Sequence, residues 1–318
     1  MQASRGNRRR GAALMLSLWA LFLLSAMVIT WTMDISSRLA LSGKASRSLE
    51  AEAMACSGAE IAMHPQMKPD STALTGGFGK NQTYEARLTG EGGRLNINWV
   101  TQLNGNVENI QRVELLRKFL ENKGYDLEER DHMIDTLLDW VDPDNLARLN
   151  GAEEGEGYSP PNRPLRRLDE MKKIKGWEEF TSSTDWEADL TLDSQAGQPG
   201  QPAQPGQAGA GALNLAWASK DIIMALPNVS EERVDQFLSL RGGPDVIGTE
   251  NDGIRDTAHA EIALGLPPGQ LQQLGVVYQA MDSVWRVVST GKSGEVTRTV
   301  RVVFVRSAPP QLKSWKEF

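Results

Sequence analysis

The chain has a single cysteine, Cys56, among its 318 residues, and only three histidines, His64, His132 and His259. One cysteine excludes an internal disulfide, so packing and hydrogen bonding alone must hold the fold together. The histidines are far apart in the sequence, and no Gly-x-Ser-x-Gly pattern presents a nucleophilic serine. The sequence therefore predicts no catalytic centre, and we expect a protein that is not an enzyme.

Positive charge is also in deficit over most of the chain. The protein has 34 Lys and Arg against 41 Asp and Glu, a net charge of −7. Four of the arginines precede residue 12, which leaves 30 basic against 41 acidic side chains in the remainder, a net charge of −11. Nucleic-acid binding needs clustered Lys and Arg to neutralise phosphates. The acidic body therefore disfavours nucleic acid as a partner.

Charge is absent altogether from the 22 residues Ala12 to Met33, which directly follow Arg8-Arg9-Arg10-Gly11. About 20 apolar residues cross a hydrocarbon core as one helix, and flanking arginines stay on the cytoplasmic side. A cleaved secretory signal is disfavoured, because its apolar core is shorter and ends at small residues. The Gly11–Ala12 junction, between the last charge and the apolar run, is where a prepilin-type signal is cut.

The apolar helix is predicted to continue beyond the membrane, because helical spacing persists and no proline occurs before Pro65. We expect one helix from Ala12 to about Met63. Alternation in 82–88 and 94–100 predicts one hairpin, and alternation in 284–290 and 295–305 predicts another.

Between the two predicted hairpins the apolar period is helical. Predicted helices start near Asn104, run through 134–141 and 165–174, and recur at 219–226, 234–241, 257–264 and 268–274. The Gly/Pro/Gln tract 194–212 has no apolar pattern and is interpreted as a flexible linker. The order predicts an α+β fold: a long N-terminal helix on an antiparallel sheet, with an inserted all-helical domain. We divide the chain into 1–11, a leader; 12–64, the helix; 65–103 with 275–318, the sheet; and 104–274, the insertion.

An acidic loop is the one candidate metal site. Its possible oxygen donors include Asp139, Asn145 and Glu156, and the four expected ligands are Asp142, Asp144, Glu153 and Glu154. Ca²⁺ takes six to eight oxygen ligands, although the spacing is not that of an EF-hand. The alternative is a solvated acidic loop that binds nothing.

A pair of predicted short helices around Pro227-Asn-Val-Ser230 is similar to a helix-hairpin-helix. DNA-binding versions have a glycine-rich turn, whereas Asn228 and Ser230 occupy those places here. A structural use of the motif is favoured, and the alternative is a membrane-anchored periplasmic nucleic-acid-binding protein. That alternative needs a basic stripe, for which Lys220, Arg233 and Arg241 are few candidates.

A series of short motifs follows in order along nearly the whole chain: Arg10-Gly-Ala12 with its apolar helix, Gly93-Arg-Leu-Asn-Ile-Asn98, Leu138-Asp-Trp-Val-Asp-Pro-Asp144, Asn150-Gly-Ala-Glu153, Pro161-Asn-Arg-Pro164, Leu168-Asp-Glu-Met-Lys-Lys-Ile-Lys-Gly176 and Leu213-Asn-Leu215. In these motifs and their order the chain resembles the minor pseudopilin K family of type II secretion systems. The tract 194–212 and Asn214-Leu-Ala-Trp217 depart from the family pattern. Most pilins carry a glutamate five residues into the mature chain, whereas Leu16 stands there, as is usual for the K-type subunit.

The resemblance implies an inner-membrane subunit with a cytoplasmic N-terminus and a periplasmic body, at the tip of a pseudopilus that moves proteins across the outer membrane. It implies cleavage by prepilin peptidase, methylation of the new amine, and calcium in the inserted domain. The implied partners are other minor pseudopilins, the major pseudopilin and the inner-membrane secretion platform. Because Leu16 cannot pair with a neighbour's N-terminal amine, no subunit need lie above this one.

Overall fold

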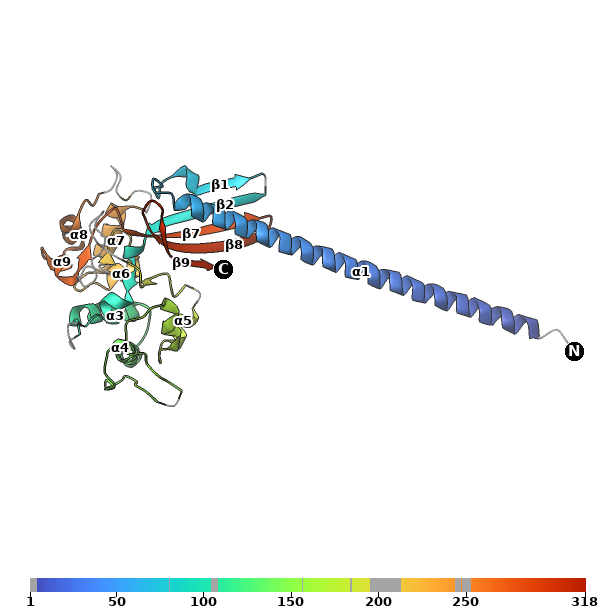
Figure 1. Cartoon of the computed structure of the whole chain (residues 1–318), viewed down its shortest axis with the longest axis horizontal. Helices are drawn as coiled ribbons and strands as arrows, with labels where there is room; N and C mark the ends of the chain where they lie inside the picture. Colours follow the sequence, from blue (N-terminus) through green and yellow to red (C-terminus); the bar gives the residue numbers. More distant parts are fainter. Residues whose placement is uncertain are drawn as a thin grey trace.

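A helix of 58 residues, α1 (Arg5–Ala62), extends far beyond the rest of the molecule (Figure 1). The computed structural model describes residues 5–79, 81–103, 108–155, 157–183, 185–194, 213–243, 247 and 253–318, with side chains from residue 13 onward. The predicted long helix is confirmed, although it begins within the basic segment. Thr30 and Thr32 donate their hydroxyls to the carbonyls of Ala26 and Val28, so these polar groups are satisfied within the helix.

The C-terminal turns of α1 pack on a five-stranded antiparallel sheet with the order β1-β2-β7-β8-β9. Its strands are β1 (Thr75–Phe78), β2 (Gln82–Gly90), β7 (Val284–Ser293), β8 (Val296–Val305) and β9 (Gln311–Glu317). The contact face of α1 is a row of fully buried alanines at every fourth position or nearly so: Ala51, Ala55, Ala59 and Ala62. Small side chains let the helix backbone approach the sheet closely, and Trp285, Val287, Val302 and Phe304 fill the space around them.

The predicted hairpin at the end of the chain is confirmed, since β7 and β8 pair antiparallel from Val284–Val305 to Ser293–Val296. The predicted hairpin between 82–88 and 94–100 is wrong. β2 pairs with β1 and β7 instead, and Leu95–Asn96 (β3) pairs in parallel with Leu190–Thr191 (β4). Residues Ile97–Val100 form the short helix α2, because the Asn96 side chain accepts a hydrogen bond from the Trp99 N–H and caps it.

The chain between β2 and β7 builds a separate, mainly helical body (Figure 1). Its longer helices are α3 (Ile110–Asn122), α4 (Leu127–Val141), α7 (Glu231–Arg241) and α8 (Thr257–Leu264). Shorter ones are α5 (Glu178–Ser182), α6 (Lys220–Met224) and α9 (Gln270–Leu274), with 3₁₀ turns at Glu91–Gly93 and Leu168–Lys173; another 3₁₀ turn, Thr72–Leu74, lies between α1 and β1. A two-strand parallel pair, β5 (Leu213–Asn214) with β6 (Val276–Val277), completes it. The helix predicted in 165–174 is therefore only a 3₁₀ segment.

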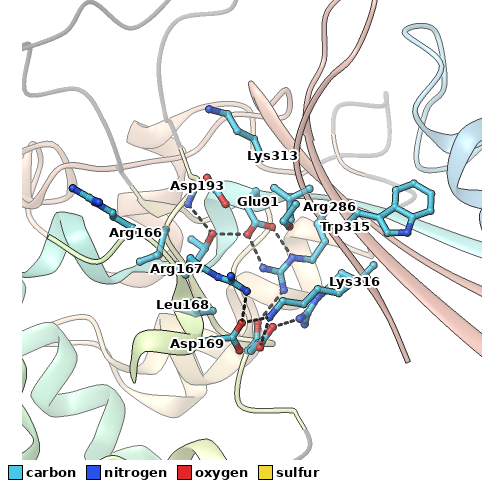
Figure 2. A pocket seen from close by; sticks show the side chains of 16 residues that line it. Glu91, Arg166, Arg167, Leu168, Asp169, Asp193, Arg286, Lys313, Trp315 and Lys316 are labelled. Carbon is cyan, nitrogen blue, oxygen red and sulfur yellow. Dashed lines mark hydrogen bonds and ion pairs between the residues drawn. The ribbon is translucent and has the colours of Figure 1, made fainter. Parts of the chain in front are cut away.

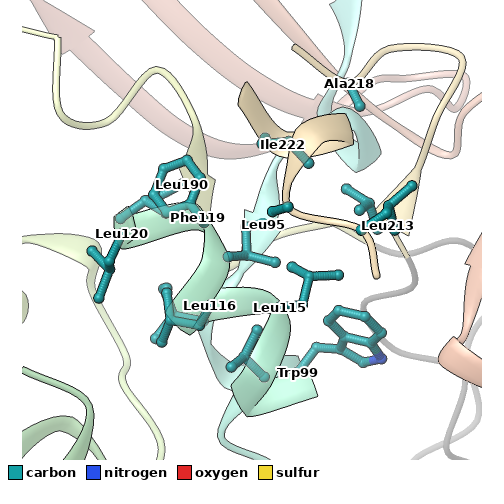
Figure 3. Close-up of a cluster of buried hydrophobic side chains, with 14 of the residues drawn as sticks. Leu95, Trp99, Leu115, Leu116, Phe119, Leu120, Leu190, Leu213, Ala218 and Ile222 are labelled. Carbon is teal, nitrogen blue, oxygen red and sulfur yellow. The ribbon is translucent and has the colours of Figure 1, made fainter. Parts of the chain in front are cut away.

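Side-chain caps set the starts of the two longest helices of this body. Asn109 caps α3, so this helix begins at Ile110 and not near Asn104, and Val107 lies outside the described residues. Asp126 and Glu129 form a capping box at α4. The helices are short and rely on a shared core, part of which Figure 3 shows between α3, β3, β4 and α6. Of the predicted linker 194–212, residues 195–212 also lie outside the described part, whereas Ser194 is described and buried.

Candidate functional site

A cluster of carboxylates lies where α4 ends and the acidic loop begins. Asp139, Asp142 and Glu153 each offer an oxygen, and these oxygens all lie within 4.8 Å of one another. Asp139 and Asp142 are one helical turn apart at the end of α4, so both point to the same side, and the loop returns Glu153 to them. Asp139 is fully buried and Asp142 is 4% exposed. Buried carboxylates this close require a positive partner.

Arg148, from the loop between them, supplies one such partner. Its Nη1 lies 2.6 Å from Asp139 Oδ1 and 2.5 Å from Asp142 Oδ2, and its Nη2 lies 2.7 Å from Glu108 Oε1. Despite partial burial, these carboxylates hold the pKa of Arg148 above its ordinary value. The Arg148 backbone N–H also donates to Asp139. One guanidinium therefore serves three carboxylates.

The cluster keeps a surplus of negative, unpartnered oxygens. Both carboxylate oxygens of Glu153 and Oδ1 of Asp142 are buried and have no hydrogen-bond partner within the described part of the chain. Burial raises the pKa of Glu153, and the neighbouring Asp139, Asp142 and Asp144 raise it further. Burial likewise raises the pKa of Asp142, although Arg148 opposes this. Oxygen atoms in this condition fit a hard divalent cation, which takes several carboxylate oxygens at once.

Two of the four expected ligands, Asp142 and Glu153, are brought together in this cluster. Asp144 is exposed and its Oδ1 accepts the Leu146 N–H, and Glu154 is exposed outside the cluster. Glu156 lies outside the described residues. Asp139 is the third carboxylate of the cluster, where Asp144 and Glu154 were expected to contribute. Its place one turn before Asp142, on the buried stripe of a predicted helix, is the signal in the sequence that identifies it.

A second polar site joins the sheet to the helical domain. Glu91, fully buried, receives Arg286 at both oxygens, at 2.6 and 2.7 Å, and the Thr191 hydroxyl at 2.5 Å. Burial alone would raise the pKa of Glu91, but Arg286 and Arg94 outweigh it and keep this pKa low. Figure 2 shows this pair at the wall of a cavity of about 420 Å³, with Lys316 reaching Asp169 beyond it. The residues link β7 with segments of the inserted domain, so we interpret this site as structural.

Cations near the helix-hairpin-helix-like turn are already engaged. Lys220 lies 2.9 Å from Glu231 and 2.7 Å from Asp235, and Arg241 donates to the carbonyls of Leu215 and Ala218. The turn itself is made by Asn228 with a φ of 61°. The nucleic-acid-binding alternative therefore finds no support in this arrangement.

The predicted processing junction, Gly11 and Ala12, lies within α1. From Ala13 onward, this helix is the one in the described chain that is long and apolar enough to cross a membrane. Its apolar side chains from residue 13 to 33 contact nothing else in the molecule and are exposed. The helix thus fits a single-pass membrane anchor.

This architecture, an apolar helix whose end packs on an antiparallel sheet with a helical insertion, is a pilin-like fold. Residues 93–182 match a family model described as type II secretion system (T2SS), protein K. This part of the chain is therefore similar to protein K of type II secretion systems. The matched range begins just before β3 and ends at α5, so it contains the carboxylate cluster.

The fold also matches a solved chain from the GspK-GspI-GspJ complex of the enterotoxigenic Escherichia coli type 2 secretion system. The TM-score is 0.56 at 13% identity, over 90% of this chain and 99% of that one. At this identity the likeness establishes a shared fold. No curated protein matches the chain significantly in sequence.

Proposed function

We propose that the protein is a minor pseudopilin at the tip of the type II secretion pseudopilus, with a structural and non-enzymatic role in protein export across the outer membrane. The observation that carries this proposal is the position of the helical domain. It lies at the end of the body opposite the free part of α1 (Figure 1). In a fibre whose apolar helices pack side by side, this bulk blocks a subunit from stacking above.

The proposed partners are other minor pseudopilins, in line with the GspK-GspI-GspJ complex that shares this fold. Cysteines introduced along 12–33 and in partner helices, in a Cys56→Ser background, test the arrangement by crosslinking. Crosslinks to minor pseudopilins on one end of this subunit alone support the tip. A ladder of crosslinks between copies of this chain, in a repeating register, would make it a shaft subunit and overturn the proposal.

We propose further that prepilin peptidase cleaves between Gly11 and Ala12, leaving α1 in the inner membrane with its body in the periplasm. The support is the change from arginines to an uncharged helix at that bond. Mass spectrometry of the mature protein should find Ala12 first, with a methylated amine. A mature chain that begins at Met1, or near residue 33, refutes the cleavage. The variant Gly11→Leu should remain unprocessed.

We also propose that the cluster of Asp139, Asp142 and Glu153 binds calcium, which would neutralise the surplus charge and stabilise the loop. The unpartnered buried oxygens of Glu153 and Asp142 support this. Binding only to the folded state adds about 2.7 kcal/mol at 100 times the Kd. The melting temperature of the full-length protein in detergent should rise with Ca²⁺ and not with Mg²⁺, whose octahedral geometry is stricter. A melt unchanged across millimolar Ca²⁺ favours the solvated-loop alternative.

A further inference from the structure

The carboxylates of the proposed calcium site are the same ones that bind the Arg148 guanidinium. We propose that Arg148 is an internal counter-cation of this cluster, that a divalent cation displaces it, and that this exchange moves the loop 145–149. The inference rests on the calcium site proposed above. It adds that Arg148 sets the affinity of the site for calcium, and that the loop 145–149 is the surface that moves when calcium binds.

Arg148 holds the loop against the end of α4 through its guanidinium and its backbone N–H. Nη1 contacts both Asp139 and Asp142, and the backbone N–H donates to the two oxygens of Asp139 at 3.3 and 3.2 Å. Nε and Nη2 contact Glu108 Oε1 at 2.8 and 2.7 Å, outside the three-carboxylate cluster. The guanidinium therefore has a second partner that remains available when the cluster is taken by another cation.

The oxygens that Arg148 leaves unused are too few for calcium. They are Oδ1 of Asp142 and the two oxygens of Glu153, all buried and unpartnered among the described residues. Ca²⁺ takes six to eight oxygens, of which carbonyls and waters can supply some, and the further carboxylate oxygens of this cluster are those of Asp139 and Asp142. Those are the atoms that Arg148 now binds.

The guanidinium and an ion cannot share these oxygens. Calcium lies about 2.3–2.6 Å from its ligand atoms. Nη1 lies at 2.6 Å from Asp139 Oδ1 and 2.5 Å from Asp142 Oδ2, so it occupies the position of an ion bound by both. Two positive groups at that separation repel strongly in a site screened from water. Binding of the ion therefore expels Nη1 and leaves Arg148 with Glu108.

The loop that carries Arg148 presents two apolar side chains to solvent. Leu146 is 78% exposed and Leu149 is 96% exposed, and both are within two residues of Arg148. When the guanidinium leaves Asp139 and Asp142, the loop is held to α4 by weaker bonds, such as those of the Arg148 backbone N–H with Asp139 and those of Asn150 with Asp135. Cation occupancy thus sets the position of an exposed apolar surface on the inserted domain.

The test compares wild type with Arg148→Gln, which removes the competing charge and keeps a polar side chain. Full-length protein in detergent is titrated with Ca²⁺ by calorimetry and melted with and without Ca²⁺. We expect Arg148→Gln to bind Ca²⁺ at least tenfold more tightly than wild type. Its melting temperature should be lower than that of wild type without Ca²⁺ and should recover with it. Arg148→Lys, which keeps the charge but loses the fork, should bind with intermediate affinity.

Arg130→Gln is the matched control. Arg130 is on α4, it pairs with Glu121 of α3 at 2.8 Å, and none of its bonds within the described part of the chain reaches the cluster. It should leave the Kd for Ca²⁺ unchanged. If wild type binds Ca²⁺ and Arg148→Gln binds equally or more weakly, Arg148 does not compete and the exchange is wrong, while the calcium site stands. If no variant binds Ca²⁺, both the exchange and the calcium site fail, and the crosslinking test of the tip is unaffected. If Arg148→Gln does not fold, Arg148→Lys decides. A Ca²⁺ affinity of Arg148→Lys that is equal to or weaker than that of wild type would show that the ion does not displace Arg148.

Discussion

The partly buried carboxyl of Asp282 connects the point where the chain leaves the sheet with the point where it returns. Its Oδ2 accepts the Gly92 N–H at 2.9 Å and its Oδ1 accepts the Val284 N–H at 3.2 Å. A Cβ on Gly92 would lie 2.5 Å from Asp282 Oδ2, so only glycine allows this approach. Burial raises the pKa of Asp282 to about 6.

This pKa predicts a pH-dependent contribution of Asp282 to stability. Because the folded-state pKa is above its ordinary value, the contribution is present at low pH and is lost as pH rises through about 6. Relative to Asp282→Asn, the wild-type free energy of unfolding should gain roughly 1 kcal/mol between pH 7 and pH 5. Denaturant unfolding of both proteins at several pH values measures this difference. Parallel pH profiles would show that Asp282 does not titrate in this range.

At the same scale, part of the carboxylate site could be predicted from the sequence. Closely spaced acids marked the loop, and Asp142 and Glu153 are indeed in the cluster. The sequence could not show that Arg148 turns inward, because arginine in an exposed loop normally faces solvent. It also could not show that Glu91 and Arg286, 195 residues apart, form a buried pair. Such pairs depend on tertiary contacts that local patterns do not encode.

At the scale of elements, α1 and β7 approach each other closely through their backbones. A Cβ on Gly291 would lie 2.0 Å from the Ala51 carbonyl oxygen and 2.3 Å from the Ala55 nitrogen, both of them backbone atoms. The helix can rest on the sheet here only because Gly291 faces a row of alanines. Backbone atoms cannot rotate away, so a larger residue must push the helix off the strand.

We therefore expect Gly291→Ala to destabilise the protein by about 3 kcal/mol, the upper part of the usual range for overpacking. The control is Gly43→Ala, at an exposed position of α1 where a Cβ meets nothing within 4 Å. This change should be neutral or should stabilise the helix slightly, because alanine favours helix over glycine. Thermal unfolding of the two variants in the same detergent compares them. Equal melting temperatures would show that α1 is not packed on β7 as described.

Element types followed from the sequence where the apolar period was long and unambiguous, as in α1, α3, α4 and the β7–β8 hairpin. They did not follow for 94–100. Leu95, Ile97 and Trp99 alternate with polar residues and suggest a strand, but Val100 is buried as well and Asn96 caps a helix. A short segment that is buried on all sides fits the apolar pattern of a strand and that of a helix equally well, and here the Asn96 cap selects the helix. The edge strand β9 was also missed, since Gln311–Glu317 is short and largely exposed.

At the scale of the whole molecule, the helical domain is held rigidly to the sheet. The Glu91–Arg286 pair, Asp282 and the T-shaped contact of Trp217 with Trp285 at 5.2 Å all cross the joint between them. Removing one partner of a buried ion pair lowers the free energy of unfolding by about 3–5 kcal/mol, so this joint resists opening. A rigid joint keeps the domain at a constant position relative to α1, as a subunit that ends a fibre requires.

The other end of the molecule gives the last prediction, which concerns Leu16. This residue lies on the uncharged part of α1 and is exposed there to the surroundings of the helix. A glutamate at this position places a carboxylate in the apolar layer, at a cost of a few kcal/mol unless an amine pairs with it. At the proposed tip no subunit above supplies that amine, so we expect Leu16→Glu to assemble no better than wild type. The measurement is recovery of partner pseudopilins with the tagged protein from solubilised membranes, and Leu16→Ala, which adds no charge, should match wild type. If Leu16→Glu instead recovers more partner than either, a neighbour's amine lies within reach of residue 16, and the subunit is not the last one in the fibre.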